Sequence, residues 1–388
     1  MSAAIGTPLV RLEGAAKVTG SADYAYEVLG EDDALYAFVA QATIVKGRIT
    51  RVDADAVLAM PGVVAVVTHE NAPQLHDAQD GEVLVLQSDR VAYRGQPVAV
   101  VVAETLEAAR EAVSALHVEY EEEPGDFQLS STHPKLYQPE QVNPAFDTTS
   151  ITGDVDAAIE AAPVVIDVTY ETPAYFNNPM EPHATTARFV RTDLGERLVL
   201  DESTQGSTAT RSAVATLFGM DAAHIHVRNE HVGGGFGSKG SPRPNVPLAI
   251  MAAKHTGRTV KLAYTRQQMF SIAGYRTPTI SRIRLAAERD GTLTAVSHEA
   301  WEQTSTVQEF AEQTAEGTRH LYATPNLFTT HSLAALDVPT PRWMRAPGEA
   351  PGVYALESAM DELAVALRMD PIELRIRCLL YTSPSPRD

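Results

Sequence analysis

Hydrophobic and polar positions in the first third of the chain alternate between two periods, which predicts an α/β unit over Leu35–Tyr120. Two runs rich in β-branched residues, Val63–Val67 and Val98–Ala103, have the composition of buried strands. Glu104–Ala115 then carries alanine and leucine at helical spacing, and His117–Glu121 returns to a strand pattern. We therefore expect strands and helices to alternate in a compact unit.

The pattern weakens over residues 121–150, where five prolines or glycines occur with little periodicity, so a domain boundary is expected there. Periodicity then returns, and a long amphipathic helix is predicted from Ala350 to Leu367, ending before Asp370-Pro371. Helices and short strands are expected in between. The predicted helices are Asp154–Ala162, Thr208–Phe218 and Val246–Lys254, and the predicted strands are Val164–Tyr170, Arg197–Asp201, His224–Asn229 and Thr259–Tyr264.

These patterns divide the chain into two expected domains, at residues 1–125 and 151–377, joined by a linker at residues 126–150. The last segment, residues 378–388, breaks off from the helical pattern and resembles a translated sequencing-library adapter. On that interpretation the natural sequence ends at Arg377. A genuine Ser/Pro-rich tail is the alternative.

Composition restricts the possible partners. The 388 residues are 44% hydrophobic and 21% charged, which is typical of a globular protein of about two or three domains. A formal charge of −19 argues against nucleic acid as a partner. No apolar run approaches the ~20 residues of a membrane helix, and Met1–Thr7 lacks the features of a signal peptide. With Cys378 as the single cysteine, this chain cannot hold disulfides or cysteine-ligated clusters alone.

The most informative local feature is the glycine-rich run His231–Gly240, which follows a predicted strand. Dense glycines allow backbone amides to approach a ligand closely and to adopt positive φ. Gly235, Gly237 and Gly240 satisfy G-x-G-x-x-G, but Pro242 and Pro244 interrupt the helix that a dinucleotide site needs next. The spacing does not fit a P-loop either. A tight turn with a core phenylalanine is the alternative to a ligand loop.

A second feature, Ser203-Thr204-Gln205, lies upstream of this loop and just after a predicted strand. The glutamine amide offers both a donor and an acceptor to a ligand oxygen. Taken alone, the tripeptide is more typical of a cap for the helix that follows.

In order along the chain, a series of short motifs resembles the molybdenum-binding subunits of the xanthine dehydrogenase and aldehyde oxidase family. In the first domain they are Lys17–Gly20, Asp23-Tyr24, Pro61–Val63, Tyr93–Ala99 and Val118–Tyr120. In the second they are Pro179–Ala184, Ser203–Gln205, Gly233–Gly237, Arg266, Arg276–Pro278, Met344–Glu349 and Glu357–Ala364. The resemblance covers nearly all of residues 5–377 and implies an α+β fold, with an α/β hammerhead domain followed by the first molybdopterin-binding domain.

The resemblance also implies a chemistry. Family members hydroxylate aldehydes or heteroaromatic rings with oxygen derived from water, and a molybdenum–molybdopterin cofactor supplies the redox chemistry. Gln205 would hydrogen-bond the molybdenum oxo group, and the amides of Gly234 and its neighbours up to Gly237 would hold the pterin side. Phe236 would border the substrate, while Arg345 would bring a permanent charge close to the metal centre. Gln205, Phe236 and Arg345 are therefore the candidate catalytic residues.

Each of these residues has a structural alternative. Phe236 could be core packing, and Arg345 and Arg276 could be surface or ion-paired arginines. Glu181 and His183 lie two residues apart, as a metal pair would, but no third ligand is evident, so metal ligation by His183 is not expected.

Two departures from the family pattern limit what can be carried over. Purine-oxidising members have a glutamate where this chain has Gly240, so an aldehyde is the expected substrate. Met344–Glu349 resembles bacterial aldehyde-oxidising branches, in which the cofactor is usually the cytosine dinucleotide form. The family's general-base glutamate lies in a C-terminal half absent here, and Glu302, Glu349 and Glu357 have no motif support for that role. This chain alone is expected to be inactive.

The resemblance implies partners as well, namely an iron–sulfur subunit with two [2Fe–2S] clusters and an FAD-binding subunit in a hetero-oligomer. We expect a small-molecule substrate and a cytoplasmic location, or a periplasmic one reached through a partner's signal. Two other interpretations stay open. The chain could be a non-catalytic scaffold that binds a partner without pterin, or a nicotinamide-dependent dehydrogenase.

Overall fold

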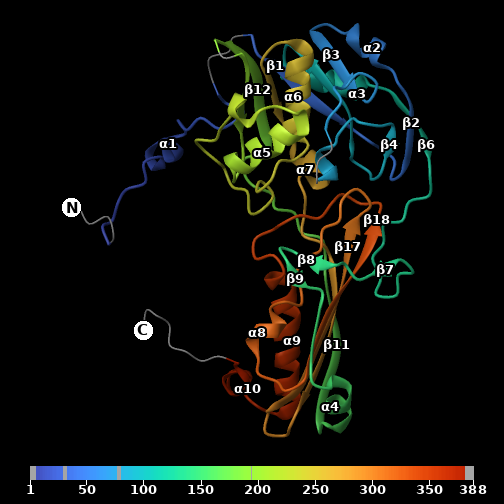
Figure 1. The fold of residues 1–388 in the computed structure, drawn as a ribbon, viewed down its shortest axis with the longest axis vertical. Coiled ribbons are helices and arrows are strands. Elements are labelled where there is room, and N and C mark those ends of the chain that lie inside the picture. Colours follow the sequence, from blue (N-terminus) through green and yellow to red (C-terminus); the bar gives the residue numbers. More distant parts are fainter. Residues whose placement is uncertain (1–5, 29–32, 77–79, 194, 381–388) are drawn as a thin grey trace.

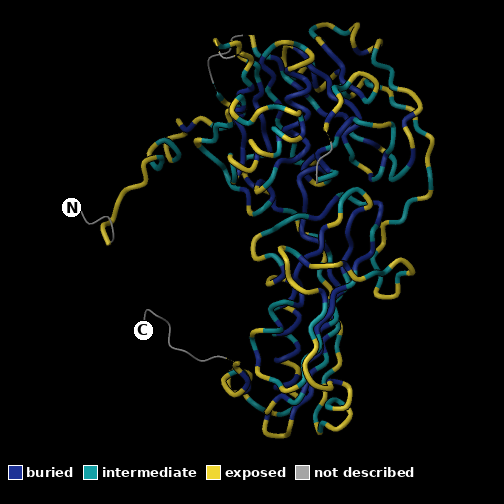
Figure 2. The backbone as a smooth tube through the Cα atoms, viewed as in Figure 1, coloured by how far each residue is buried: buried dark blue, intermediate teal, exposed yellow. Residues whose placement is uncertain are grey.

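The structure, a computed structural model, describes residues 6–28, 33–76, 80–193 and 195–380. Within these ranges the chain forms an upper and a lower body in the view of Figure 1, each built around a β-sheet. The N-terminal arm, residues 6–23, leaves the upper body and is largely exposed (Figure 2), with Leu12 at 99% exposure. None of the described helices is long and apolar enough to cross a membrane.

The upper body contains a seven-stranded sheet that draws its strands from two distant parts of the sequence. Its order is β14 (Ile225–Arg228), β13 (Gly195–Glu202), β12 (Ala184–Thr192), β15 (Val260–Ala263), β1 (Leu35–Gln41), β5 (Pro97–Ala103) and β3 (Val63–Thr68). β1 joins the two halves, because it pairs with β15 in parallel and with β5 antiparallel. The strands of the first hundred residues and those after residue 184 therefore share one sheet.

Both faces of this sheet are covered, which explains why β5 is apolar throughout. Val100 and Val102 face a core shared with α6, whereas Ala99 and Val101 face a second core on the side of α3, as the two-residue period of a strand requires. α6 is buried on every side along most of its length, as its continuous apolar sequence predicts. The helices of this body are α2 (Ala54–Leu58), α3 (Leu106–Ala115), α5 (Ser207–Phe218), α6 (Asn245–Thr256) and α7 (Arg266–Ile272), with short 3-10 turns η1 (Gly81–Val83) and η2 (Ala222–His224).

A small three-stranded sheet completes the upper body, and two further short strands pair beside the lower one. The first sheet has the order β4 (Arg90–Val91), β2 (Gly47–Val52) and β6 (Val118–Glu122), and the pair is β8 (Gln141–Val142) with β9 (Phe146–Asp147).

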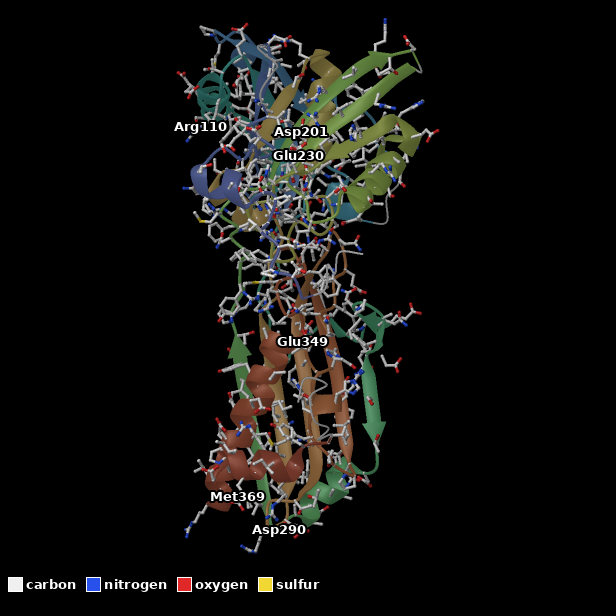
Figure 3. The ribbon with its side chains drawn as sticks, turned by 90° about the vertical axis from the view of Figure 1, so that its left-hand side faces the viewer. Arg110, Asp201, Glu230, Asp290, Glu349 and Met369 are labelled. Carbon is white, nitrogen blue, oxygen red and sulfur yellow. The ribbon has the colours of Figure 1, made fainter. Side chains whose placement is uncertain are left out.

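The lower body is a long sheet with helices on both faces. Its strands, in order, are β10 (Thr149–Thr152), β18 (Leu327–Leu336), β17 (Leu293–Ser305), β16 (Thr279–Ala287) and β11 (Val164–Thr172), and β7 (Leu136–Tyr137) pairs with β18. α9 (Glu349–Leu367) packs on Ile283 and Leu285, whereas α4 (Val155–Ala161) packs on Ala286 from the opposite face. Figure 3 shows Glu349 where α9 begins between the two bodies, with Met369 and Asp290 at the far end.

Three short helices lie outside these layers, namely α1 (Gly14–Thr19) in the N-terminal arm, α8 (Thr318–Leu321) and α10 (Pro371–Cys378). Cys378 ends α10 with a buried side chain, and Leu379 forms a bridge with Tyr322. Residues 381–388, which are most of the segment expected to be non-native, lie outside the described residues.

The predicted elements with regular apolar spacing are confirmed, from β3 and β5 through α3, α4, α5 and α6 to the long helix α9. The α+β fold class is confirmed too. The segment expected to be a linker contains the short strands β7, β8 and β9 and the start of β10. The long strands β16, β17 and β18 were not predicted. β17 buries polar side chains such as Ser297, His298 and Glu302, so its apolar pattern is interrupted.

Candidate functional site

The glycine-rich loop joins β14 to α6 and lies where the upper body meets the lower one. Gly234 and Gly237 have φ values of 97° and 102°, which side-chain-bearing residues rarely adopt. A Cβ atom on Gly237 would lie 2.5 Å from the Trp343 carbonyl oxygen, and one on Gly235 would lie 2.4 Å from Gln205 Oε1. The glycines are therefore required both by backbone conformation and by close neighbours.

Gln205 is bound to this loop through its own amide group. Its Oε1 accepts hydrogen bonds from the backbone nitrogens of Gly237 (2.9 Å) and Lys239 (3.3 Å), and its backbone nitrogen donates to the Lys239 carbonyl at 2.8 Å. Two N–H donors fix Oε1 as the acceptor, which leaves Nε2 as the outward group. Nε2 has no partner among the described residues, and Gln205 is exposed. The side chain is thus oriented to donate to an external acceptor.

Phe236 is at the surface of the loop, so its interpretation as core packing is wrong. Phe236 is 46% exposed, and its backbone φ is 54°. Its carbonyl oxygen accepts hydrogen bonds from Arg345 N (2.9 Å) and Asn177 Nδ2 (2.8 Å). The loop and the Arg345 segment are therefore joined at Phe236.

Arg345 is exposed beside this junction, and its guanidinium has no partner among the described residues. The three predicted catalytic residues therefore belong to one patch, because Gln205 bonds to Gly237, and the neighbouring Phe236 bonds to Arg345. Arg276, which could have been a surface arginine, is instead buried beneath the Arg345 segment.

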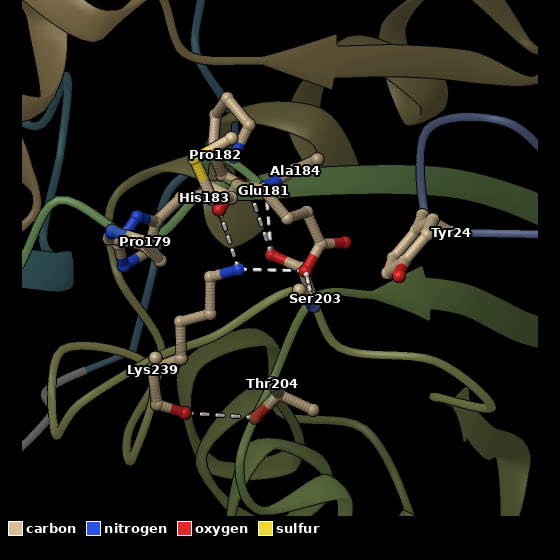
Figure 4. Close-up of polar contacts among 12 residues, drawn as sticks. Tyr24, Pro179, Glu181, Pro182, His183, Ala184, Ser203, Thr204 and Lys239 are labelled. Atoms are coloured by element: carbon tan, nitrogen blue, oxygen red, sulfur yellow. Dashed lines mark hydrogen bonds and ion pairs between the residues drawn. The ribbon is translucent and has the colours of Figure 1, made fainter. Parts of the chain in front are cut away.

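A buried ion pair lies under the other end of the loop (Figure 4). Lys239 Nζ donates to Glu181 Oε2 at 2.8 Å and to the Glu181 carbonyl at 2.9 Å, and Gly233 N donates to the same Oε2 at 2.8 Å. One carboxylate therefore binds both ends of the run Gly233–Lys239. Burial lowers the pKa of Lys239, while the charge of Glu181 opposes that shift.

His183 is buried behind the same loop, with Nε2 3.3 Å from the Ser238 carbonyl oxygen. Burial lowers its pKa to about 3, and the positive charge of Lys239 contributes, so the imidazole is neutral at physiological pH. Glu181 is occupied by Lys239, and no group of three potential metal-binding side chains occurs in the described part of the chain. Glu181 and His183 thus both contact the glycine-rich loop.

The start of α5 contributes a further binding feature beside Gln205. Its first residue is preceded by Gly206, which has no side chain to cap the helix. The interpretation of Ser203–Gln205 as a helix cap is therefore wrong, since Gly206 is the N-cap residue and no side-chain capping hydrogen bond is made there. Backbone N–H groups in the first turn of a helix favour anionic ligands. Together with Gln205 Nε2 and Arg345, this end of α5 suits a ligand with negative charge and oxygen acceptors.

Of the acidic residues considered as bases, Glu357 and Glu302 are engaged elsewhere. Glu357 accepts from Arg375 Nε and the Tyr322 hydroxyl, both at 2.6 Å, in the lower body. Glu302 is fully buried, and burial together with the charge of Glu312 raises its pKa to about 8. Glu349 is exposed at the start of α9.

Four supporting residues were missed from the sequence, namely Asn177, Lys239, Glu312 and Trp343. Asn177 Nδ2 donates to the carbonyls of Phe236 (2.8 Å) and Trp343 (3.2 Å), although the residue lies 59 positions before Phe236. Two of them were near a motif in the sequence. Asn177 precedes Pro179–Ala184, and Lys239 lies within the glycine-rich run His231–Gly240.

Two family models match the chain. Residues 19–124 match the aldehyde oxidase and xanthine dehydrogenase a/b hammerhead domain, and residues 136–379 match the molybdopterin cofactor-binding domain. The boundary between the matches, at residues 125–135, lies just before β7 in the connection between the two bodies.

Curated relatives include the aldehyde oxidoreductase molybdenum-binding subunit PaoC of Escherichia coli (strain K12), 37% identical over 387 residues, with 99% of this chain and 51% of that protein covered. The nicotinate dehydrogenase large molybdopterin subunit of Eubacterium barkeri is 28% identical over 384 residues, covering 96% of this chain and 88% of that protein. The chain spans about half the length of the PaoC proteins it matches.

Solved structures share the fold. The aldehyde oxidoreductase from Desulfovibrio gigas aligns with a TM-score of 0.81 and 25% identity, covering 97% of this chain and 43% of that one. Quinoline 2-oxidoreductase from Pseudomonas putida 86 aligns with a TM-score of 0.84 at 22% identity, covering 97% of this chain and 50% of that one.

Proposed function

This chain belongs to the molybdenum-binding subunits of the xanthine dehydrogenase and aldehyde oxidase family, and from that premise we propose that it forms one wall of an aldehyde-oxidising active site. The observation that carries the proposal is the outward Nε2 of Gln205, which is held in place by the glycine-rich loop beside exposed Phe236 and Arg345. A donor, a ring and a fixed positive charge on one patch can orient a cofactor and a carbonyl substrate together.

Each residue has a definite task in this proposal. Gln205 Nε2 would donate a hydrogen bond to an oxygen at the cofactor's metal centre, and its orientation is already fixed by the loop. The amides of Gly234 and Gly235 would face the pterin side, while the amide of Gly237 would keep Gln205 Oε1 in place. The molybdenum–molybdopterin group supplies the redox chemistry.

The remaining two residues act on the substrate side. Phe236 borders the substrate with an exposed ring and excludes water from it. Arg345 polarises a substrate oxygen or balances the anionic cofactor, because its charge is permanent and unpaired among the described residues.

Substrate and cofactor form follow from the chain's own residues and from its relatives. Gly240 offers no carboxylate to a purine, and PaoC is named an aldehyde oxidoreductase subunit, so an aldehyde is the proposed substrate. We propose the cytosine dinucleotide form of the cofactor on the resemblance of Met344–Glu349 to aldehyde-oxidising branches.

One cysteine cannot hold a cluster, so electrons would leave these 388 residues for iron–sulfur centres held elsewhere. We propose an iron–sulfur subunit and an FAD subunit in a hetero-oligomer, which fits relatives that are themselves named as subunits. Residues 1–125 and 151–377 would be the two domains, the compartment would be the cytoplasm or a periplasm reached with a partner, and the catalytic base would come from sequence not present here.

The test is purification of the complete subunit with its partners from cells that make the molybdenum cofactor. We expect bound molybdenum, a cytosine dinucleotide on acid release, and faster turnover of an aldehyde than of xanthine. Gln205→Ala should lower kcat about 10²-fold, as loss of one transition-state donor does in other enzymes. Gln267→Ala changes an exposed glutamine in α7 and serves as the matched control.

Three results would count against the proposal. A complex without molybdenum would support the scaffold alternative, in which the chain binds a partner without cofactor. Binding of NAD in a titration would support a nicotinamide-dependent enzyme. Equal activity of the Gln205→Ala and Gln267→Ala variants would remove Gln205 from the site. The chain expressed alone should show no turnover of an aldehyde.

A further inference from the structure

The turn at residues 344–348, which carries Arg345, has a backbone conformation that is unfavourable without contacts from other segments. Ala346 has a φ of 56° and Gly348 a φ of 76°, so an alanine occupies the left-handed region that favours glycine. Such a conformation in a residue with a side chain is unfavourable and persists only where neighbours impose it. Something outside the turn must therefore fix its shape.

Arg276 does so from below. Its Nη2 contacts three consecutive carbonyl oxygens of the turn, those of Met344 (3.0 Å), Arg345 and Ala346 (3.1 Å). Arg276 is only 6% exposed, and its own backbone is fixed by a bridge to Tyr175 at the start of the lower sheet. These carbonyls cannot rotate away without leaving the buried Nη2 without its hydrogen-bond acceptors.

Glu312 supports the arginine and the end of the turn at the same time. Its Oε1 lies 3.4 Å from Arg276 Nε, an ion-pair distance without hydrogen-bond geometry, and accepts from Gly348 N at 2.8 Å. Glu312 is fully buried, and burial raises its pKa to about 7 while Gly348 N and Arg276 oppose the shift. Gln313 Nε2 also donates to the Pro347 carbonyl at 2.9 Å. The segment 312–313 thus holds the turn from the side opposite the glycine-rich loop.

The other end of the turn contacts the candidate site directly. Arg345 N donates to the Phe236 carbonyl at 2.9 Å, and Asn177 joins the Phe236 and Trp343 carbonyls. Gly237, next in sequence, donates to Gln205 Oε1. A displacement of the turn would therefore move Arg345 relative to Phe236 and Gln205.

We propose that Arg276 and Glu312 are positioning residues, which set the place of the Arg345 guanidinium relative to Phe236 and Gln205 without contacting cofactor or substrate. The inference rests on the proposed function, because it is expressed through Arg345. Arg276 and Arg345, which lie 69 residues apart in sequence, therefore have different roles. Arg345 acts on the ligand, whereas Arg276 acts on the backbone of Arg345.

The test uses the assembled holoenzyme with the variants Arg276→Met, Arg276→Lys, Glu312→Gln and Arg345→Ala. Arg276→Met should lower kcat about 10- to 100-fold, with molybdenum content close to wild type, and Arg276→Lys should recover part of the loss. The Mo(V) paramagnetic resonance spectrum of Arg276→Met should shift toward that of Arg345→Ala. Arg282→Met, which changes an exposed arginine of β16 paired with Asp167, is the control and should match wild type.

The double variant decides whether Arg276 acts through Arg345. If it does, Arg276→Met/Arg345→Ala is no slower than Arg345→Ala alone, because the first change has nothing left to misplace. Multiplicative losses, or a wild-type spectrum in Arg276→Met, would overturn the inference. If both Arg276 variants fail to accumulate, Glu312→Gln carries the same spectral test.

Hydrogen exchange gives a readout that needs no cofactor. The amides of Arg345 and Gly348, which bond to Phe236 and Glu312, should exchange faster in Arg276→Met than in Arg282→Met. A wild-type enzyme without molybdenum or turnover would instead refute the proposed function, and that failure is visible before any variant is compared.

Discussion

The core of the upper body and the junction between the bodies are held together by different interactions. We define the junction as the loops at residues 231–243, 306–316 and 340–348. In the core, β5 is apolar and buried over its full length, and its neighbours are valines, alanines and leucines. In the junction, buried residues include Lys239, Arg243 and Glu312. Regular strands satisfy their own backbone groups, whereas irregular loops require charged side chains to do so.

Two arginines of the junction pair with a carboxylate from a third, distant segment. Glu82, in η1, accepts from Arg243 Nη1 at 2.8 Å and from Arg342 Nε at 2.8 Å, and Arg342 also pairs with Asp80. Arg243 follows the glycine-rich loop, and Arg342 precedes the Arg345 turn. A buried pair of this kind adds little net stability relative to apolar residues, but it fixes which segments meet.

The largest expected effect comes from removing the carboxylate that two of these arginines share. Glu82→Leu would leave Arg243, which is 1% exposed, without its ion-pair partner, and we expect a loss of about 3–5 kcal/mol in the free energy of unfolding. Urea titration followed by circular dichroism measures this loss.

The control for Glu82→Leu is a carboxylate at the surface. Asp167→Leu removes an exposed partner of Arg282, and its cost should stay below about 1 kcal/mol. Equal losses for the two variants would mean that burial of the charge does not matter, and the contrast between junction and surface pairs would fail.

A somewhat smaller loss is expected in the core. Leu200→Ala removes a fully buried side chain of β13 from the core shared with α6, at a cost of about 2–5 kcal/mol. Unlike Glu82→Leu, it should leave hydrogen exchange at residues 231–243 unchanged in the native state, because the cavity lies within the sheet. Faster exchange in that loop would show that core and junction are not independent.

A third change, Gly235→Ala, tests the close contact within the loop. The added Cβ would lie 2.4 Å from Gln205 Oε1, so the glutamine or the loop must move, with a loss of about 1–3 kcal/mol in stability. Molybdenum content of the holoenzyme should fall at the same time. Gly240→Ala is the control, since its nearest neighbour would be the Gly237 carbonyl oxygen at 3.3 Å. A Gly235→Ala enzyme with full molybdenum would contradict the steric argument.

The same contrast explains what could be predicted from the sequence. The strands β3 and β5 and the helices α6 and α9 follow from apolar spacing, because burial of regular elements leaves a periodic signal. β17 gave no such signal, since His298, Glu302 and Gln303 are buried on polar contacts supplied by other segments. Those contacts depend on the tertiary structure and cannot be read from local spacing.

The residues of the candidate site also differ in how well the sequence predicts them. Gln205 and Phe236 could be proposed because glycine density and a family motif mark the loop. Arg276 looked like any arginine, and its role depends on Met344–Ala346, 68 to 70 residues later. The Glu82–Arg342 pair spans 260 residues. Long-range charge pairing has no sequence period, so the residues that support a site are harder to predict than the residues that form it.

The smallest expected effect is in how stability depends on pH, and it comes from acids buried in the sheets as well as in the junction. Burial raises the pKa of Glu202 in β13 and of Glu302 in β17 from 4.5 to about 8, and that of Glu312 in the junction to about 7. A carboxyl whose folded pKa exceeds its unfolded value binds its proton more tightly when folded. Its contribution to stability is therefore present below pH 4.5 and is lost as pH rises toward 8.

Buried histidines act in the opposite sense and at lower pH. Burial lowers the pKa of His183 and His298 to about 3, so their contribution is present above pH 6.5 and is lost as pH falls. Between pH 6.5 and 8 the buried acids, rather than these histidines, should determine how steeply the free energy of unfolding changes with pH. The free energy of unfolding should decrease there by up to about 1.4 kcal/mol per pH unit for each such acid.

Glu302→Gln, which can still accept from Glu312 N, should flatten the slope by roughly one such step, whereas Leu200→Ala should lower stability equally at every pH. Parallel curves for wild type and Glu302→Gln would mean that Glu302 does not titrate in this range, and burial of that carboxyl would then have no effect on the pH dependence of stability.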